Sequence, residues 1–235
     1  MYILIDYYNL HHSHKKDGLK SLSNIILSNV DFDSPFFDKN IEIRLYGGWY
    51  DKNILSRHAQ DLAVEINSSM PYSYKDSKTL KNSIVNFELA YSLLSDKNKH
   101  LFYTYRMRGV YYGLKSKKAT ELNCFEPDCP VNIIHNLLSK NACQKCERKE
   151  MQSIFYRGEQ KLVDSMLTAD LIYLSLNKEK LIIITSDDDI WPGVFTSLSI
   201  GGQILHIESK NNEKEFDFGS YLSSNLNYKL IKLIK

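Results

Sequence analysis

Aspartates end two apolar stretches of this chain, which raises the question of what neutralises them. The stretch YILID ends at Asp6, and LIIITSDDD ends in Asp187, Asp188 and Asp189. A carboxylate beside a buried core destabilises the fold unless it is solvated, hydrogen-bonded or neutralised by a cation. Strand-end aspartates commonly cap the following helix, which explains either stretch by itself. Two such stretches favour a shared cation, because carboxylates held close together repel one another.

A further acidic residue occurs in the motif KLVD. Lys161 and Asp164 are three residues apart, so we expect both on one face at the start of a helix. An acid in the first turn of a helix also stabilises the helix dipole, which is the ordinary alternative role for Asp164. Asp170 and Asp188 are second-tier candidates. Asp170 is either a buried, hydrogen-bonded structural acid or a fourth member of the acidic site.

The chemistry that such a cluster supports is metal-dependent hydrolysis of a phosphate ester. Carboxylates and waters are the hard oxygen ligands that Mg²⁺ or Mn²⁺ prefers. A bound metal activates a water, stabilises the charge that develops on a phosphate and orients the scissile bond. We expect Asp6 and Asp187 to be direct metal ligands. Asp189 and Asp164 are expected to be direct or water-mediated ligands or a general base, and Asn9 to hold Asp6 or a phosphate oxygen.

Strands and helices must alternate along the chain to position these residues. We expect strands at 2–6, 41–48, 100–107, 180–189 and 203–207, and helices at 18–29, 51–67, 77–95, 158–176 and 191–200. This alternation predicts an α/β fold with a mainly parallel sheet and helices on both faces. Sites in such sheets form at the carboxyl ends of the strands, where Asp6 and Asp187 are expected.

These stretches resemble the NYN family of PIN-like ribonucleases. That family opens with an apolar strand ending in an aspartate followed three residues later by asparagine, as Asp6 and Asn9 do in IDYYNL. It continues with a lysine and an aspartate at the head of a helix, as in KLVD, often with another aspartate, as in LTAD. It closes with an acidic turn and a proline, which TSDDDI resembles through Asp187 and Asp189, followed by Pro192.

The resemblance implies a three-layer, Rossmann-like PIN fold and a divalent-metal-dependent endoribonuclease that cleaves single-stranded RNA. It does not extend over residues 109–156. The chain departs from the family pattern at Tyr7, where a small residue is usual, and at Ser186 and Ile190, where glycine and an aromatic residue are usual. We expect the Tyr7 ring to lie near the site and to affect substrate access. None of these departures removes a carboxylate.

Four cysteines occur close together in the segment that the resemblance leaves out. Their spacing is C-x4-C-x13-C-x2-C, at Cys124, Cys129, Cys143 and Cys146. Pairs of cysteines separated by short loops are typical of closed, structural zinc sites with four thiolate ligands. Iron is an alternative with the same ligands, and four unrelated buried cysteines are the alternative without a metal. We therefore predict an inserted zinc-binding module at 109–152 within a nuclease domain at 1–108 and 153–235.

Basic residues flank the cysteines and follow the first strand. The candidate contacts to nucleic acid are Lys15, Lys16, Lys115, Lys117, Lys118 and Lys161. Lysine runs are more often solvated surface. Tyrosines at 103, 105, 111 and 112 make base stacking plus phosphate contact plausible for a single-stranded substrate.

Composition limits the remaining choices. The 235 residues carry a formal net charge of only +2, so a site for a polyanion must be local. No apolar run approaches the roughly 18 to 20 residues of a membrane span, and clustered cysteines suit a reducing compartment. We expect a cytoplasmic protein that does not enter a membrane.

Two further readings of the function stay open. A haloacid-dehalogenase-like phosphatase also begins with a strand ending in Asp, but it needs a second Asp at position 8, which is Tyr here. A catalytically silent module of the same fold would bind RNA or protein. Single-stranded DNA is an alternative substrate, and the zinc module is an alternative dimerisation surface that would give a homodimer.

Overall fold

The computed structural model describes residues 1–30, 38–109, 114–140, 156–209 and 218–233. The chain divides into two compact units, which are described separately below. Unit 1 comprises Met1–Thr104 and Gln160–Lys235, and unit 2 comprises Tyr105–Glu159.

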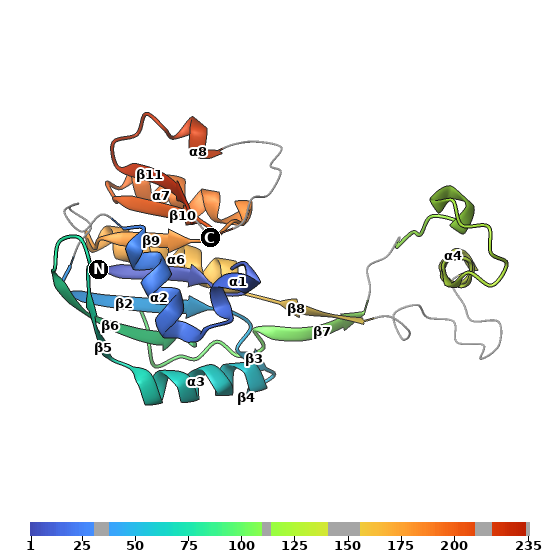
Figure 1. The fold of residues 1–235 in the computed structure, drawn as a ribbon, viewed down its shortest axis with the longest axis horizontal. Helices are drawn as coiled ribbons and strands as arrows, with labels where there is room; N and C mark the ends of the chain where they lie inside the picture. The colour runs from blue at the N-terminus through green and yellow to red at the C-terminus, as the bar shows by residue number, and fades with distance from the viewer. Residues whose placement is uncertain (31–37, 110–113, 141–155, 210–217, 234–235) are drawn as a thin grey trace. The chain divides into compact units, whose positions relative to one another are not determined.

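Unit 1 is built on a seven-stranded sheet (Figure 1). Its strands follow the order β11-β10-β9-β1-β2-β6-β5, and every neighbouring pair is parallel except β5 with β6. The bounds are β1 Tyr2–Asp6, β2 Asn40–Tyr46, β5 Tyr72–Lys75, β6 Asn82–Leu89, β9 Leu181–Ile184, β10 Ile204–Glu208 and β11 Tyr228–Lys232. The predicted α/β class with a mainly parallel sheet is therefore confirmed.

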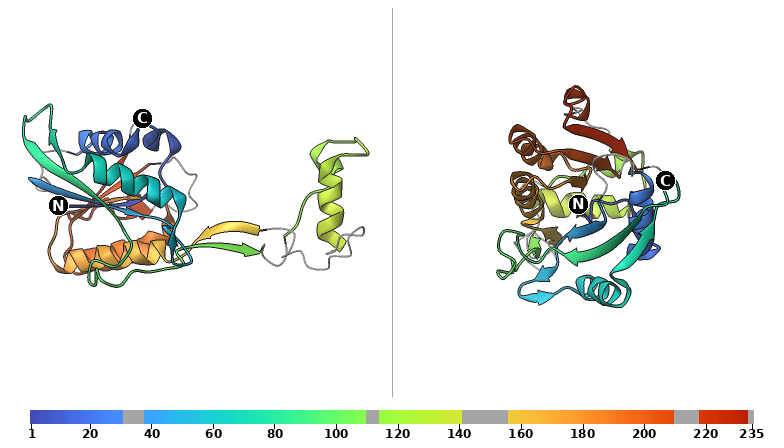
Figure 2. Two further views of the ribbon diagram at one scale, coloured as in Figure 1. Left: turned by 90° about the horizontal axis from the view of Figure 1, so that it is seen from below. Right: turned by 90° about the vertical axis from the view of Figure 1, so that its left-hand side faces the viewer.

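Helices cover both faces of this sheet (Figures 1 and 2). On one face, α2 Gly18–Ser28 and α3 Arg57–Ser69 pack with strand residues such as Ile3 and Ile5. On the other face, α6 Val163–Leu176 and α7 Trp191–Ser199 pack with Leu4. Successive residues of β1 thus enter opposite layers, as the alternation of side chains along a strand requires. Both layers exclude water, which explains why β1 and β9 are apolar on both faces.

The order of the strands creates a switch point between β1 and β9. From β1 the chain adds β2 and then β6 on one side, and β9, β10 and β11 extend the sheet on the other side. The connections leaving β1 and β9 therefore run in opposite directions, which opens a crevice at the carboxyl ends of these two strands. Ligands of open α/β sheets bind in such crevices.

The predicted helix at 77–95 is wrong, because a turn and β6 occupy most of this segment. Val85, Phe87 and Leu89 alternate with more exposed residues and are buried, whereas Ile84 is 54% exposed. A helical spacing is also present, at Leu80, Ile84, Phe87, Tyr91 and Leu94, so the local pattern supports both structures. Parallel pairing with β2 decides in favour of the strand, because it satisfies the backbone groups of both segments.

Other elements begin or end away from their predicted bounds. The predicted helix at 51–67 begins only at Arg57, because β3 Tyr50–Asp51 and β4 Ile54–Leu55 form an antiparallel hairpin before it and Ser56 caps it. The predicted helix at 158–176 begins at Val163. Unit 1 also contains elements that were not predicted: α1 His12–Lys15, η2 Asp188–Ile190, α8 Phe218–Tyr221 and β11.

Unit 2 contains the segment in which the zinc-binding module was predicted. Its described elements are β7 Tyr105–Gly109, η1 Ala119–Leu122, α4 Pro130–Lys140 and β8 Tyr156–Gln160, whose last residue belongs to unit 1. The predicted strand at 100–107 is thus shifted to β7. Among the described residues of both units, no helix has the length and apolar character needed to cross a membrane.

Candidate metal centre

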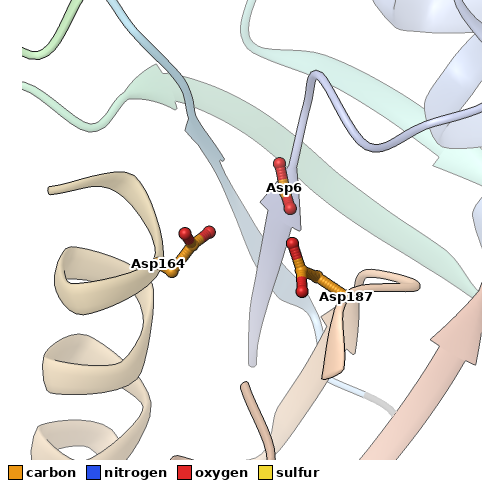
Figure 3. Close-up of side chains that lie close together, drawn as sticks. All are labelled: Asp6, Asp164 and Asp187. Atoms are coloured by element: carbon orange, nitrogen blue, oxygen red, sulfur yellow. The ribbon is translucent and has the colours of Figure 1, made fainter. Parts of the chain in front are cut away.

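Three carboxylates meet at the switch point of the sheet (Figure 3). Asp6 ends β1, Asp187 follows β9, and Asp164 lies in the first turn of α6. One carboxylate oxygen from each lies within 4.8 Å of the others. We call these residues the acidic trio. Residues from three separate elements therefore converge on a volume that a single cation can share.

The register between β1 and β9 brings Asp6 and Asp187 together. Ile5 pairs with Ile184, so Asp6 lies level with Thr185. The Thr185 hydroxyl donates to Asp6 Oδ2 at 3.3 Å and accepts from the Asp187 backbone N–H at 3.1 Å. Thr185 thus links the two acidic strand ends. Sequence analysis missed this residue, although its place beside Asp6 follows once the two strands are paired.

The start of α6 positions Asp164. Leu162 precedes the helix in the left-handed conformation, with φ at 68°, which is uncommon for a residue other than glycine. Asp164 then faces the crevice from the first helical turn. The prediction that Lys161 shares a helix face with Asp164 is wrong, because Lys161 lies before the helix begins.

Asn9 connects two members of the acidic trio. Its backbone N–H donates to Asp6 Oδ1 at 3.3 Å, and its Nδ2 donates to Asp187 Oδ2 at 3.5 Å. Asn9 thus contacts Asp6 through its backbone and Asp187 through its side chain. These hydrogen bonds orient the two carboxylates without adding a further negative charge.

The other two acids of the TSDDDI turn have different surroundings. The Asp189 backbone N–H donates to Asp187 Oδ1 at 3.1 Å, so Asp187 caps η2 as well as facing the acidic trio. Asp188 is exposed and accepts from Trp191 Nε1 at 3.1 Å. Asp189 is also exposed, and its carboxylate is not part of the group within 4.8 Å. Of the expected ligands Asp6, Asp187 and Asp189, the structure thus brings only the first two together, and Asp164, expected as a ligand or a general base, is the third carboxylate of the group.

Asp170 was expected to be either a buried structural acid or a fourth member of the acidic site, and its contacts are those of a structural acid. It is 1% exposed and accepts from Arg44 Nε at 3.1 Å, from the Tyr46 hydroxyl at 2.7 Å and from the Leu94 backbone N–H at 2.7 Å. Its oxygens are thus engaged with β2 and with the segment after β6. Asp170 anchors α6 to the sheet and is not a fourth member of the acidic site.

Burial and mutual repulsion make the acidic trio unfavourable in its fully charged form. Burial raises the pKa of Asp6, and the charge of Asp187 adds to this effect while hydrogen bonds from Asn9 oppose it. Asp164 is more exposed, yet partial burial and the charges of Asp6, Asp187 and Asp189 raise its pKa to about 6. A divalent cation would reverse both effects, because it favours the charged carboxylates.

The acidic trio lines an open pocket of about 260 Å³. The other lining residues are Tyr8, Asn9, Gln160 and Val163. Carboxylate and amide oxygens on one side suit a hard cation such as Mg²⁺ or Mn²⁺, with water completing its coordination. The donor set therefore fits the metal predicted from the sequence, and the pocket leaves room for an oxygen ligand from a substrate.

The expectation that Tyr7 lies near the site is wrong, because Tyr8 is the tyrosine that lines the pocket. Tyr7 is 5% exposed and packs in the core against Trp49 and His58. Tyr7 and Tyr8 lie in the turn that follows β1, so the alternation of a strand does not decide which of the two rings faces the pocket.

The predicted basic contacts are dispersed. Lys15 Nζ donates to the Tyr7 carbonyl at 3.2 Å and lies near the rings of Tyr7 and Tyr8, and Lys16 is exposed beside it. Lys161 is half-buried in unit 1. The remaining candidates, Lys115, Lys117 and Lys118, are exposed in unit 2.

The predicted zinc ligands are only partly described. Cys129 is buried and Cys124 is half-buried, and neither forms a disulfide. Cys143 and Cys146 lie outside the described residues. The zinc site therefore stays a prediction.

Comparisons of this chain with protein-family models, curated proteins and solved structures found no match. The site is therefore interpreted from its own geometry.

Proposed function

We propose that this chain is a divalent-metal-dependent nuclease that hydrolyses phosphodiester bonds of single-stranded RNA. The observation that carries the proposal is the convergence of Asp6, Asp164 and Asp187 from three elements at the carboxyl ends of β1 and β9. The resemblance to NYN-type ribonucleases is consistent with the same residues. The proposal does not depend on that resemblance, because the ligand chemistry alone suits metal-dependent phosphate hydrolysis.

The residues of the acidic trio would hold Mg²⁺ or Mn²⁺, which supplies an activated water and neutralises charge on the phosphate. Asn9 keeps Asp6 and Asp187 oriented toward the pocket. Asp164 would bind the metal directly or through a water, or would accept a proton from the attacking water as a general base. Asp189 contributes negative charge beside the trio.

The size of the pocket favours a polymeric substrate over a small molecule. Pockets that enclose small ligands span about 300 to 1,000 Å³, whereas this one has about 260 Å³ and is open to solvent. A metal, its waters and one phosphate group would fill much of it. The rest of the substrate then lies across the surface, as a nucleic-acid strand would, and no chain end is required. This favours endonucleolytic cleavage.

The rival proposal is a catalytically silent RNA- or protein-binding module. A silent module has no need for a cluster of carboxylates that destabilises the metal-free fold. The two proposals differ in the effect on RNA cleavage that they predict when one carboxylate of the acidic trio is neutralised. Asp187→Asn preserves the shape of the side chain and removes a carboxylate of the acidic trio, whereas Asp188→Asn changes the neighbouring exposed acid, which accepts a hydrogen bond from the Trp191 indole.

The test is cleavage of a circular, single-stranded RNA by the purified protein with Mg²⁺, Mn²⁺ or EDTA. We expect linear products with either metal and none with EDTA. Asp187→Asn should reduce the rate by at least about 100-fold, in the range reported for losing one electrostatic contact to a transition state, and Asp188→Asn should cleave like wild type. Equal cleavage by Asp187→Asn and wild type would overturn the proposal. A parallel assay with circular single-stranded DNA separates the two nucleic acids.

A further inference from the structure

We infer that Tyr8 is the surface on which an unpaired nucleobase of the substrate stacks, beside the phosphate at the acidic trio. The inference rests on the proposed nuclease function and deepens it. It assigns the specificity for single strands to one residue. It also places a nucleobase next to the scissile bond.

The position of Tyr8 supports this role. The side chain lines the same pocket as Asp6, Asp164 and Asp187, and it is only half-buried. Tyr8 and Val163 are the apolar members of a lining that otherwise consists of acids and amides. A group that binds there therefore meets an aromatic residue as well as metal-binding oxygens, which matches a base and its adjoining phosphate.

Neighbouring rings hold Tyr8 in place. Its centroid lies 5.7 Å from that of Trp49, 5.8 Å from that of His58 and 6.0 Å from that of Tyr7. Trp49 is completely buried, and its indole Nε1 donates to the Leu45 carbonyl at 3.1 Å. Tyr8 thus rests on a rigid base. A preorganised ring loses little conformational freedom when a ligand stacks on it.

Gly47 has no side chain, which leaves room for the rings of Tyr8 and Trp49. A Cβ at this position would lie 2.8 Å from Tyr8 Cε2 and 2.7 Å from the Trp49 ring, closer than real contacts permit. Any larger residue at the end of β2 would therefore displace one of the two rings. The backbone at this edge of the sheet is shaped around them.

Lys15 places a positive charge over the Tyr8 ring. Its Nζ lies 5.9 Å from the Tyr8 centroid, while the described lining of the pocket contains no lysine or arginine. A phosphate that follows the stacked base can interact with this ammonium group. Aromatic rings combined with lysine contacts are the usual means of binding single strands.

A base can stack on Tyr8 only if its face is free. In a duplex both faces are covered by neighbouring base pairs, so a duplex must first be opened to use this surface. The geometry therefore selects single strands and loops. A merely structural Tyr8 would support the fold in the same way whatever the nucleic acid.

The test measures binding of a labelled single-stranded RNA in the Asp187→Asn background, in which cleavage is disabled. Tyr8→Ala should weaken binding on the order of 5- to 100-fold, the effect of losing one stacked base, and Tyr8→Phe and Tyr8→Trp should retain it. Tyr173→Ala, at an exposed tyrosine of α6 outside the pocket, is the control and should bind like the parent. Circular dichroism and melting curves verify that each variant is folded.

A series of RNAs with one abasic position each then separates stacking from folding. With Tyr8 present, one abasic position should weaken binding strongly, and with Tyr8→Ala that position should cause no additional loss. Equal losses with and without the ring, or unchanged binding by a folded Tyr8→Ala variant, would overturn the inference. If Tyr8 and one base are coupled in this way but the wild-type protein never cleaves RNA, the stacking role of Tyr8 is retained and the proposed nuclease function is rejected.

Discussion

Asp164 is held in surroundings that favour its protonated form. Its pKa is raised to about 6 by burial and by nearby carboxylates, whereas an unfolded chain has an ordinary aspartate pKa of about 4. Between these values the metal-free folded state binds more protons than the unfolded state. Its stability therefore falls as pH rises from about 4 to about 6 and stays lowered at neutral pH. The residues that would bind the metal thus destabilise the protein without it.

Asp164→Asn should raise the melting temperature of the metal-free protein at pH 7.5. We expect a gain of about 2 °C, since the exposed side chain is partly screened by solvent and the effect stays below about 1 kcal/mol. At pH 5 the difference should shrink, because the wild-type carboxyl is then largely protonated. Melting curves in EDTA at the two pH values measure this. An identical melting temperature for both proteins at pH 7.5 would contradict the assigned repulsion.

At the scale of elements, the position of Asp164 depends on how α6 is attached to the sheet. Asp170, on the same helix, accepts hydrogen bonds from Arg44 and Tyr46 of β2. Arg44 also contacts Glu88 and the Ser92 carbonyl, so one buried guanidinium joins β2, β6 and α6. This network fixes the helix against the sheet from inside the protein, away from the pocket.

Asp170→Ala should destabilise the protein by about 3 kcal/mol, because it leaves the buried Arg44 charge without one of its partners. Asp188→Ala removes an exposed acid and one hydrogen bond, so it should cost about 1 kcal/mol or less. Urea unfolding curves measure both values. Well below its melting point, Asp170→Ala should still cleave RNA. A folded Asp170→Ala protein with unchanged stability but no cleavage would return Asp170 to the site.

At the scale of the whole molecule, the chain combines a unit that carries the acidic trio with one that carries the cysteines. We predict about one equivalent of zinc per chain, bound by Cys124, Cys129, Cys143 and Cys146. Cys143→Ser should release the metal and lower stability while leaving every carboxylate in place. Elemental analysis in reducing buffer measures the content. Iron in place of zinc would support the alternative metal, and neither metal would refute the site.

The lysines of unit 2 allow a second prediction at this scale. Lys115, Lys117 and Lys118 are exposed, and replacing all three with Gln should weaken RNA binding if they contact phosphates. Each lost contact on a single strand reduces the salt slope by about 0.7, so three reduce it by about 2. Binding titrations over a range of salt concentrations measure the slope. An unchanged slope would assign these lysines to solvated surface.

The sequence by itself determined the parts of the fold in which local pattern permits one structure. The runs at β1 and β9 are apolar throughout, so they had to be buried strands, and parallel pairing then brings Asp6 and Asp187 to one edge. The place of Asn9 beside Asp6 was predictable as well, because Asn9 follows the end of β1 by only three residues. These inferences need only the side-chain period of a strand and the direction of its neighbours.

Only the tertiary structure decided the features that depend on a partner distant in the chain. Residues 82–89 fit a helix or a strand equally well until pairing with β2 selects β6. Asp164 and Asp189 were equivalent as acids, and the start of α6 brings only Asp164 within 4.8 Å of the other two. Asp170 became structural because Arg44 and Tyr46 face it, and Tyr8 instead of Tyr7 lines the pocket because the Tyr7 ring is buried in the core. Spacing along a chain specifies a direction for each side chain, whereas contacts across the sheet determine what lies in that direction.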